Sequence, residues 1–440
     1  MKICCFPCIS HIATMSCVLN LNTLYAIILL MKLLTRFKSI LSPSIIHGVI
    51  PAILLSLSVG QIYAFTLFST QIANRLSCSQ SSVQFTFSLG IFFLGMGAAF
   101  FGRIVERDLK LSTIIGTTLF VLGLAVSHLA VILSSIWLLY IGYGLLVGLG
   151  TGIIYITPVK TMMLWFPKRR ALASAIPIIG FGLGSSLCTI IHNMLSQSMT
   201  SDMMFIYLAF IYLIMMCIGS YLLRKPVIQF QLNNEPNSIE KLSLKEIFKK
   251  KLFWFLWAWL LINISAGLAI IPISKQILTS INSTATLISI TLILMGFMNG
   301  FGRYLFAHIS DNLITREEIL MIIGKILIFA FPICWFFRES GIMISTLFLI
   351  LTCCYGAGFA VIPSIVYKHF GVHNASTVHG LVLSAWGISG LIGNQIGLFL
   401  FEHGGFMGLT IILYLVHVIN FVIFASIIFS KGMGVHEKQC

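Results

Sequence analysis

Charge is what this 440-residue chain has least of. It holds 12 aspartates and glutamates, and all charged residues together make up 9% of the chain, whereas 58% of its residues are hydrophobic. A soluble domain carries about 25% charged residues, and a chain this poor in charge would expose too much apolar surface to water. The composition therefore excludes a water-soluble protein and predicts that most of the chain lies in a lipid bilayer.

The excess of basic over acidic residues does not indicate nucleic acid. The net charge is +15, but the lysines and arginines fall in short gaps between apolar runs, as in the cytoplasmic loops of membrane proteins. Cysteine gives no metal signal either, because Cys5-x-x-Cys8 has no second pair at zinc spacing. We therefore expect no nucleic-acid partner, no metal and no cofactor.

Twelve apolar runs are long enough to cross a bilayer as helices. They lie at residues 47–72, 83–104, 111–130, 134–159, 169–195, 203–223, 252–278, 284–308, 317–337, 341–366, 374–400 and 404–430. We expect an all-α membrane protein of twelve transmembrane helices in two six-helix halves, residues 44–223 and 252–430. The polar stretch between them, residues 224–251, is expected to be a cytoplasmic linker.

Residues 1–43 precede the first run, and residues 431–440 form a short tail. A signal peptide, an extra helix and a misplaced start site all fit the first segment. We favour a start at Met31, because the chain from there already holds twelve spans and a basic beginning. By our count 22 of the 27 lysines and arginines lie on one side, so the positive-inside rule places both termini in the cytoplasm.

The second half repeats landmarks of the first at an offset of 205 residues. Glu106 and Asp311 follow the second and eighth spans, Pro158 and Pro363 end the fourth and tenth, and Gly182 and Gly387 lie in the fifth and eleventh. Each match alone is weak, but three at one offset predict two parallel repeats with a substrate site between them. We expect the halves to rock alternately, with these prolines and glycines at the moving contacts.

No acidic residue lies well inside a span, so the charges at membrane depth are only positive. Arg303 lies eight residues before Asp311, or about 12 Å inside the eighth span. A guanidinium binds a carboxylate through two parallel hydrogen bonds, so we predict that Arg303 binds an organic anion; the alternative is that it snorkels to the surface. Glu106 with Arg107, and Asp311 with Arg316, predict a latch between the halves, unless they are ordinary loop charges.

Residues 142–184 combine a glycine-rich helix, Tyr155-x-x-Pro158 and Trp165-Phe166-Pro167 followed by basic residues. This pattern resembles the span-four-to-five signature of the oxalate:formate antiporter family within the major facilitator superfamily. Residues 355–393, 299–311 and 63–65 also match. The resemblance implies the fold of the monocarboxylate transporters, a small organic anion as substrate, and a bacterial inner membrane.

By this resemblance Arg303 matches the span-eight arginine that grips the substrate carboxylate. The oxalate carrier adds a lysine in span eleven, where this chain has Trp386, so a monocarboxylate such as pyruvate, lactate or formate is favoured over a dicarboxylate. Monocarboxylate transporters carry an aspartate where this chain has Asn299. Further candidates for the cavity wall are polar or aromatic residues of the inner spans: Gln61, Tyr63, Tyr155 and Tyr355.

The prediction is thus a secondary active transporter, either an antiporter with a counter-anion or a proton symporter. Two alternatives stay open: a major facilitator carrier for a sugar or drug, and a transporter-like sensor that binds its ligand without net flux. We do not expect an enzyme, because the sequence shows no paired histidine and carboxylate at catalytic spacing, and His308-x-x-Asp311 alone is not a catalytic set.

Overall fold

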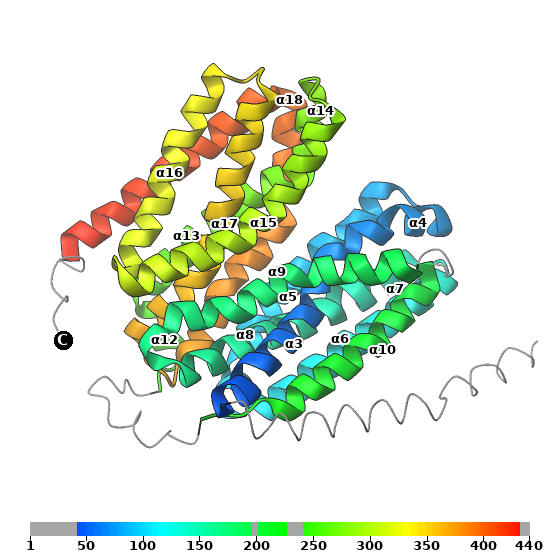
Figure 1. Ribbon diagram of the computed structural model, residues 1–440, viewed down its shortest axis with the longest axis vertical. Coiled ribbons are helices and arrows are strands. Elements are labelled where there is room, and N and C mark those ends of the chain that lie inside the picture. The colour runs from blue at the N-terminus through cyan, green and yellow to red at the C-terminus, as the bar shows by residue number, and fades with distance from the viewer. Residues whose placement is uncertain (1–41, 196–200, 227–240, 432–440) are drawn as a thin grey trace, which may run out of the picture. The chain divides into compact units, whose positions relative to one another are not determined.

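The computed structural model of the protein describes residues 42–195, 201–226 and 241–431. The chain divides into two compact units, residues 1–46 and 47–440, and the second holds the sites described below. Most of the expected N-terminal segment, and the tail beyond Lys431, lie outside the described residues. Within the described ranges, all regular secondary structure is helical (Figure 1).

Among the described residues, twelve helical segments are long and apolar enough to cross a membrane, as predicted. The N-terminal half contains η1 (Ile45–Val49), α3 (Ile50–Val59), η2 (Gly60–Phe65), α4 (Thr66–Leu76), α5 (Gln80–Arg107), α6 (Leu109–Ile132), α7 (Ile136–Leu139), η3 (Tyr140–Val147), α8 (Gly148–Trp165), η4 (Pro167–Arg169), α9 (Arg170–Leu195) and α10 (Ser201–Leu222). The C-terminal half contains α13 (Lys251–Ile270), η5 (Ile271–Ile273), α14 (Ser274–Ser280), α15 (Ala285–Asn312), α16 (Arg316–Phe336), α17 (Gly341–Phe370) and α18 (Ala375–Lys431). The short helix α12 (Leu244–Lys249) precedes α13.

Polar residues begin several of these helices. The Asp108 carboxylate accepts hydrogen bonds from the backbone N–H groups of Lys110 and Leu111 at the start of α6. Thr315 and Glu318 form a reciprocal capping box at the start of α16. The first N–H groups of a helix have no partner within it, so these side chains satisfy them and fix where the helix begins.

Helix α18 contains both the eleventh and the twelfth spans. Gly405 interrupts it with a φ of 59°, a conformation that glycine adopts without steric cost. In Figure 1 the orange part of α18 and its red part run in different directions from this region. The expected break between these spans, at residues 401–403, therefore lies close to Gly405.

The prolines lie inside their helices rather than at the ends. We expected Pro158 and Pro363 to end the fourth and tenth spans, but α8 continues to Trp165 and α17 to Phe370. Both prolines are buried against neighbouring helices. Packed neighbours let a membrane helix tolerate proline, which is why the chain does not leave the helix there.

Glycines bring the second and eleventh spans together across the two halves. A Cβ atom added to Gly95 of α5 would lie 2.7 Å from the backbone nitrogen of Gly387 in α18. A Cβ atom added to Gly387 would lie 2.7 Å from the carbonyl oxygen of Phe92. There is no room for a side chain at either position, so these helices meet backbone to backbone, as small-residue interfaces in membranes allow.

Candidate functional site

Arg303 lies between the two halves and does not reach the surface. It is carried by α15, and its side chain is almost completely buried, with 1% of its surface exposed. Its Nη1 donates a hydrogen bond to the carbonyl oxygen of Ile178 on α9, in the N-terminal half. The guanidinium also lies 5.4 Å from the ring centre of Phe359 on α17. The charge is therefore held within the protein rather than snorkelling to the membrane surface.

Six aromatic side chains pack against one another next to Arg303, and we call this cluster the aromatic chamber. The N-terminal half contributes Tyr63, Tyr155 and Phe181, and the C-terminal half contributes Tyr355, Phe359 and Trp386. The halves meet directly here, because the hydroxyls of Tyr63 and Tyr355 lie 3.5 Å apart. The ring centres of Tyr155 and Trp386 are 5.5 Å apart, and those of Phe181 and Trp386 are 5.8 Å apart.

The chamber holds a positive charge without a matching negative one. Within the described ranges, no aspartate or glutamate forms an ion pair with Arg303. Its Nε and the hydroxyl of Tyr155 are buried, and neither has a hydrogen-bond partner among the described residues. Burying a charge without a partner is costly. A ligand with a carboxylate would supply both the missing charge and the missing acceptors.

The buried arginine is present in the C-terminal repeat and has no counterpart in the N-terminal repeat. At the offset of 205 residues, the position of Arg303 in the second span is occupied by Ala98. Gly182 of α9 leaves space beside the guanidinium, since an added Cβ would lie 3.5 Å from Nη1. The predicted pair Gly182 and Gly387 thus both lie at contacts between the halves, one beside the charge and one in the close packing of α5 and α18.

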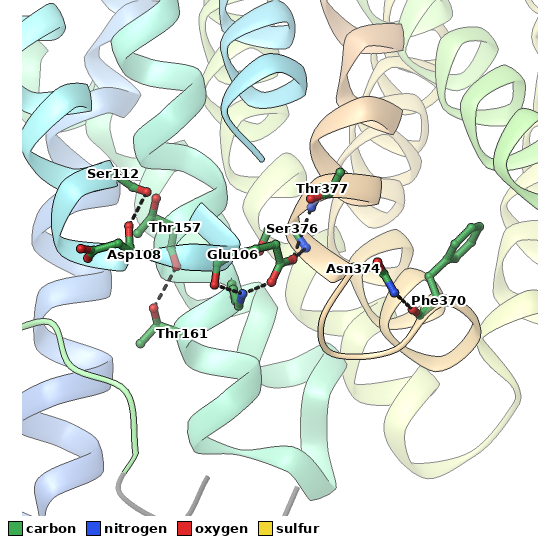
Figure 2. A network of polar contacts seen from close by, with 10 residues as sticks. Glu106, Asp108, Ser112, Thr157, Thr161, Phe370, Asn374, Ser376 and Thr377 are labelled. Atoms are coloured by element: carbon green, nitrogen blue, oxygen red, sulfur yellow. Dashed lines mark hydrogen bonds and ion pairs between the residues drawn. The ribbon is translucent and has the colours of Figure 1, made fainter. Parts of the chain in front are cut away.

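Glu106 ties the end of α5 to the opposite half, as Figure 2 shows. Its Oε1 accepts hydrogen bonds from the backbone N–H groups of Ser376 and Thr377, the second and third residues of α18, the bond from Thr377 being 3.4 Å long. Its Oε2 forms an ion pair with Lys160 of α8, within its own half. A carboxylate at a helix N-terminus is favoured both by the free N–H groups and by the helix dipole.

Asp311 makes the same contact in the opposite direction. Its two carboxylate oxygens accept hydrogen bonds from Ala171 N–H at 3.3 Å and Leu172 N–H at 2.8 Å, near the start of α9. Arg316 lies 3.6 Å from it. Ala171 and Leu172 precede Ser376 and Thr377 by 205 residues. Each half therefore uses a carboxylate to bind the N-terminus of a helix in the other, and we call these two contacts the double latch.

Two predicted residues lie away from these contacts. Arg107 is exposed and forms no ion pair with any described residue. We expected Arg107 beside Glu106, but Lys160 forms the ion pair there. Gln61 is fully buried in η2, and no described hydrogen bond joins it to Arg303 or to the chamber. Glu106, Asp311 and Arg316 thus lie where the two halves meet, with Lys160 rather than Arg107 beside Glu106, and their role as a latch stays a prediction.

Sequence reasoning missed three residues of the chamber region. Phe181 and Phe359 complete the ring of aromatics, and His379 lies buried with its ring centre 6.3 Å from that of Tyr155. A helical spacing could have indicated His379, because it precedes Trp386 by seven residues and so lies on the same face of the span. The two phenylalanines carry no sequence signal that separates them from the many other aromatics in the spans.

The sequence profile of the Major Facilitator Superfamily matches residues 49–394. The chain belongs to this superfamily. It is 26% identical over 355 residues to the "Uncharacterized MFS-type transporter YhjX" of Escherichia coli (strain K12), covering 78% of this chain and 85% of that protein. It is 22% identical over 354 residues to the "Oxalate:formate antiporter" of Oxalobacter formigenes, covering 79% and 83%.

Solved structures of other major facilitator transporters share the fold. A bacterial homologue of the iron transporter ferroportin, in an outward-facing state, superposes with a TM-score of 0.67 at 12% identity, covering 88% of this chain and 99% of that one. The proton:xylose symporter XylE gives 0.62 at 13%, covering 87% and 94%. This protein is therefore a secondary carrier of the superfamily, with twelve candidate spans in the part of the chain that the structure describes, and the superfamily's members are transporters rather than enzymes.

Proposed function

We propose that this major facilitator carrier moves a small organic anion, a monocarboxylate, across the membrane by alternating access. The observation that carries the proposal is Arg303, a buried guanidinium that bridges the halves through a backbone carbonyl and has no described carboxylate beside it. A substrate carboxylate can replace the Ile178 carbonyl and accept two parallel hydrogen bonds. Binding then releases a contact between the halves at the same moment as it fills the site.

The chamber suits one carboxylate better than two, or than a sugar. Arg303 is the only cation that the described residues place against these aromatic walls. Trp386 and Phe359 offer apolar faces, which fit a short carbon chain. A sugar carrier needs several side chains that hydrogen-bond hydroxyls, and here Tyr63, Tyr155 and Tyr355 are the polar members. The similarity to the oxalate:formate antiporter of Oxalobacter formigenes also favours an anion.

The double latch supplies the moving contact that alternating access requires. Glu106 and Asp311 hold the halves together at one side of the membrane, and by the positive-inside rule this side is the cytoplasmic one. The positive-inside rule also favours both termini and the linker on this side. The similarity to bacterial carriers favours the inner membrane of a bacterial cell. Opening to the cytoplasm then needs both carboxylates to leave their helix N-termini, while Lys160 and Arg316 stay with them.

The test is uptake of radiolabelled pyruvate, lactate, formate and oxalate into proteoliposomes. We expect saturable uptake of one monocarboxylate that is lost in Arg303→Ala. Lys325→Ala is the matched control, because Lys325 is also a cation within a span but is exposed on α16, near Phe421. Equal uptake by wild type and Arg303→Ala would contradict the proposal. No transport of any anion by folded protein would favour the sugar, drug or sensor alternatives.

The coupling is tested in the same vesicles. Internal unlabelled anion should accelerate uptake if the carrier is an antiporter, and an imposed pH gradient should drive accumulation if it is a proton symporter. Histidine can carry a coupling proton, and the buried ring of His379 has its centre 6.3 Å from that of Tyr155 in the chamber. His379→Gln should therefore abolish the pH dependence of a symporter and leave an anion exchanger unchanged.

A further inference from the structure

The short helix α12 presents an apolar ridge bordered by lysines. One side chain, Ile247, is buried and fixes the helix to the protein. Leu244 and Phe248 lie one turn apart and are exposed, with 38% and 40% of their surfaces accessible. Lys245 and Lys249 follow them in sequence, so they lie beside this ridge on the helix surface. The helix is thus amphipathic, with a basic border along its exposed apolar side.

This ridge lies where the chain enters the membrane. Helix α13, the seventh span, begins at Lys251, two residues after α12 ends. Trp254, in the first turn of that span, is half-exposed and donates from its indole N–H to the Phe248 carbonyl at 2.9 Å. Its ring centre is 5.9 Å from that of Phe248. Tryptophan in this position is typical of the boundary between lipid and water.

The lysines of α12 form no ion pair within the described ranges. Glu246, the acidic residue of the helix, turns back to accept a hydrogen bond from Ser243 N–H at 2.6 Å. Neither Lys245 nor Lys249 forms an ion pair with any residue that the structure describes. A ridge of apolar and aromatic side chains with free lysines beside it matches a bilayer surface that carries negative headgroups.

Two contacts connect α12 to the latch. The backbone N–H of Leu242, just before the helix, donates to Asn374 Oδ1 at 2.8 Å. Lys250, just after it, lies 5.2 Å from the ring centre of Phe370, whose carbonyl accepts from Asn374 Nδ2 at 2.8 Å. Asn374 directly precedes α18, and Ser376 is one of the two residues that Glu106 binds. The segment 370–374 therefore lies between the membrane-surface helix and the latch.

We propose that α12 binds the anionic lipid surface of the leaflet it faces, and that this binding holds the Glu106 latch closed. Lipid fixes the position of Leu242 and Lys250, which fix Asn374 and the first turn of α18. The N–H groups of Ser376 and Thr377 then stay in place for the Glu106 carboxylate. Lipid charge thereby favours the conformation that is closed on this side, independently of which solute the carrier moves.

The test compares hydrogen–deuterium exchange of the full-length protein in nanodiscs of phosphatidylcholine with and without phosphatidylglycerol. We expect the amides of residues 244–249 and 374–378 to exchange several-fold more slowly with the anionic lipid. Lys245→Gln/Lys249→Gln should remove this difference. The control Lys168→Gln/Arg169→Gln should keep it, because these residues are equally exposed but belong to η4.

A third variant separates lipid binding from its effect on the latch. Asn374→Ala removes the acceptor of Leu242 N–H and leaves the lysines in place, so the lipid should still protect residues 244–249 but no longer residues 376–377. Equal exchange in the two lipids, or an undiminished lipid effect in Lys245→Gln/Lys249→Gln, would overturn the proposal. Protection of α12 without any change at residues 376–377 in the wild type would overturn its regulatory part.

Discussion

Replacing Glu106 by glutamine should open the latch without removing the hydrogen-bond acceptor. Glu106 makes two kinds of contact: an ion pair with Lys160 in its own half, and hydrogen bonds from Ser376 and Thr377 in the other. Breaking a buried ion pair costs about 3–5 kcal/mol. That cost falls on both conformations alike, because Lys160 moves with Glu106, so it lowers the stability of the fold and does not shift the equilibrium between conformations.

Only the bonds across the halves distinguish the closed conformation from the open one. A hydrogen bond to a charged group contributes about 1.5–3 kcal/mol, and a neutral one about 0.5–1.5 kcal/mol. Glu106→Gln should therefore disfavour the closed conformation by about 1–2 kcal/mol, which is a shift of about 5- to 30-fold in the equilibrium. The backbone amides of Ser376 and Thr377 report this shift, because their exchange rate follows the population of the open conformation.

The matched control is Asp108→Asn. Asp108 also binds a helix N-terminus through its carboxylate, but the helix is α6 in its own half. The control should lower thermal stability and leave the exchange of Ser376 and Thr377 unchanged. If Glu106→Gln exchanges no faster than wild type at these two amides, or if Asp108→Asn accelerates them equally, the assignment of Glu106 to the latch fails.

Asp311→Asn should open the second latch by a similar factor, because the Asp311 carboxylate also accepts hydrogen bonds from two backbone N–H groups. Amide hydrogen exchange near the start of α9 should then be faster, and unchanged exchange there would refute the second latch. Gly387→Ala should slow transport, because its Cβ would meet the Phe92 carbonyl at 2.7 Å, whereas Gly296→Ala, with open space around it, should transport normally. Arg303→Lys should lower kcat/KM for transport of the anion at least about tenfold, because lysine keeps the charge but not the two parallel hydrogen bonds. It should still retain more uptake than Arg303→Ala. Full activity of Arg303→Lys would exclude paired hydrogen bonds between Arg303 and the substrate carboxylate.

The sequence alone predicted the twelve spans of the described residues and their division into two halves, and it singled out Arg303, which the structure buries. These rest on strong signals: long apolar runs, a fixed offset, and an ionisable residue at membrane depth. It misplaced the helix ends at Pro158 and Pro363, because a proline weakens a helix locally while neighbouring helices decide whether the helix continues. The α12 helix was hidden in a stretch that composition marked only as polar and basic.

The site was predicted less well than the fold, and for a physical reason. Arg303, Tyr155 and Trp386 lie together as expected, but Arg107 and Gln61 do not join them or the latch. A charge in a loop can turn in many directions, and a single sequence does not reveal which neighbour it meets. The partner of Glu106 lies 54 residues away on another helix, so local sequence could not distinguish Lys160 from the adjacent Arg107.

The two latches share their geometry but not their surroundings. Lys160 is as buried as Glu106, at 6% side-chain exposure for each, whereas Arg316 beside Asp311 is 25% exposed. Salt screens an exposed pair more than a buried one. Raised ionic strength should therefore weaken the link of Asp311 to Arg316 and leave Glu106 with Lys160 intact. Both ion pairs lie within one half, so this weakening lowers the stability of the fold and leaves the balance between the closed and open conformations to the backbone N–H groups that Glu106 and Asp311 bind across the halves.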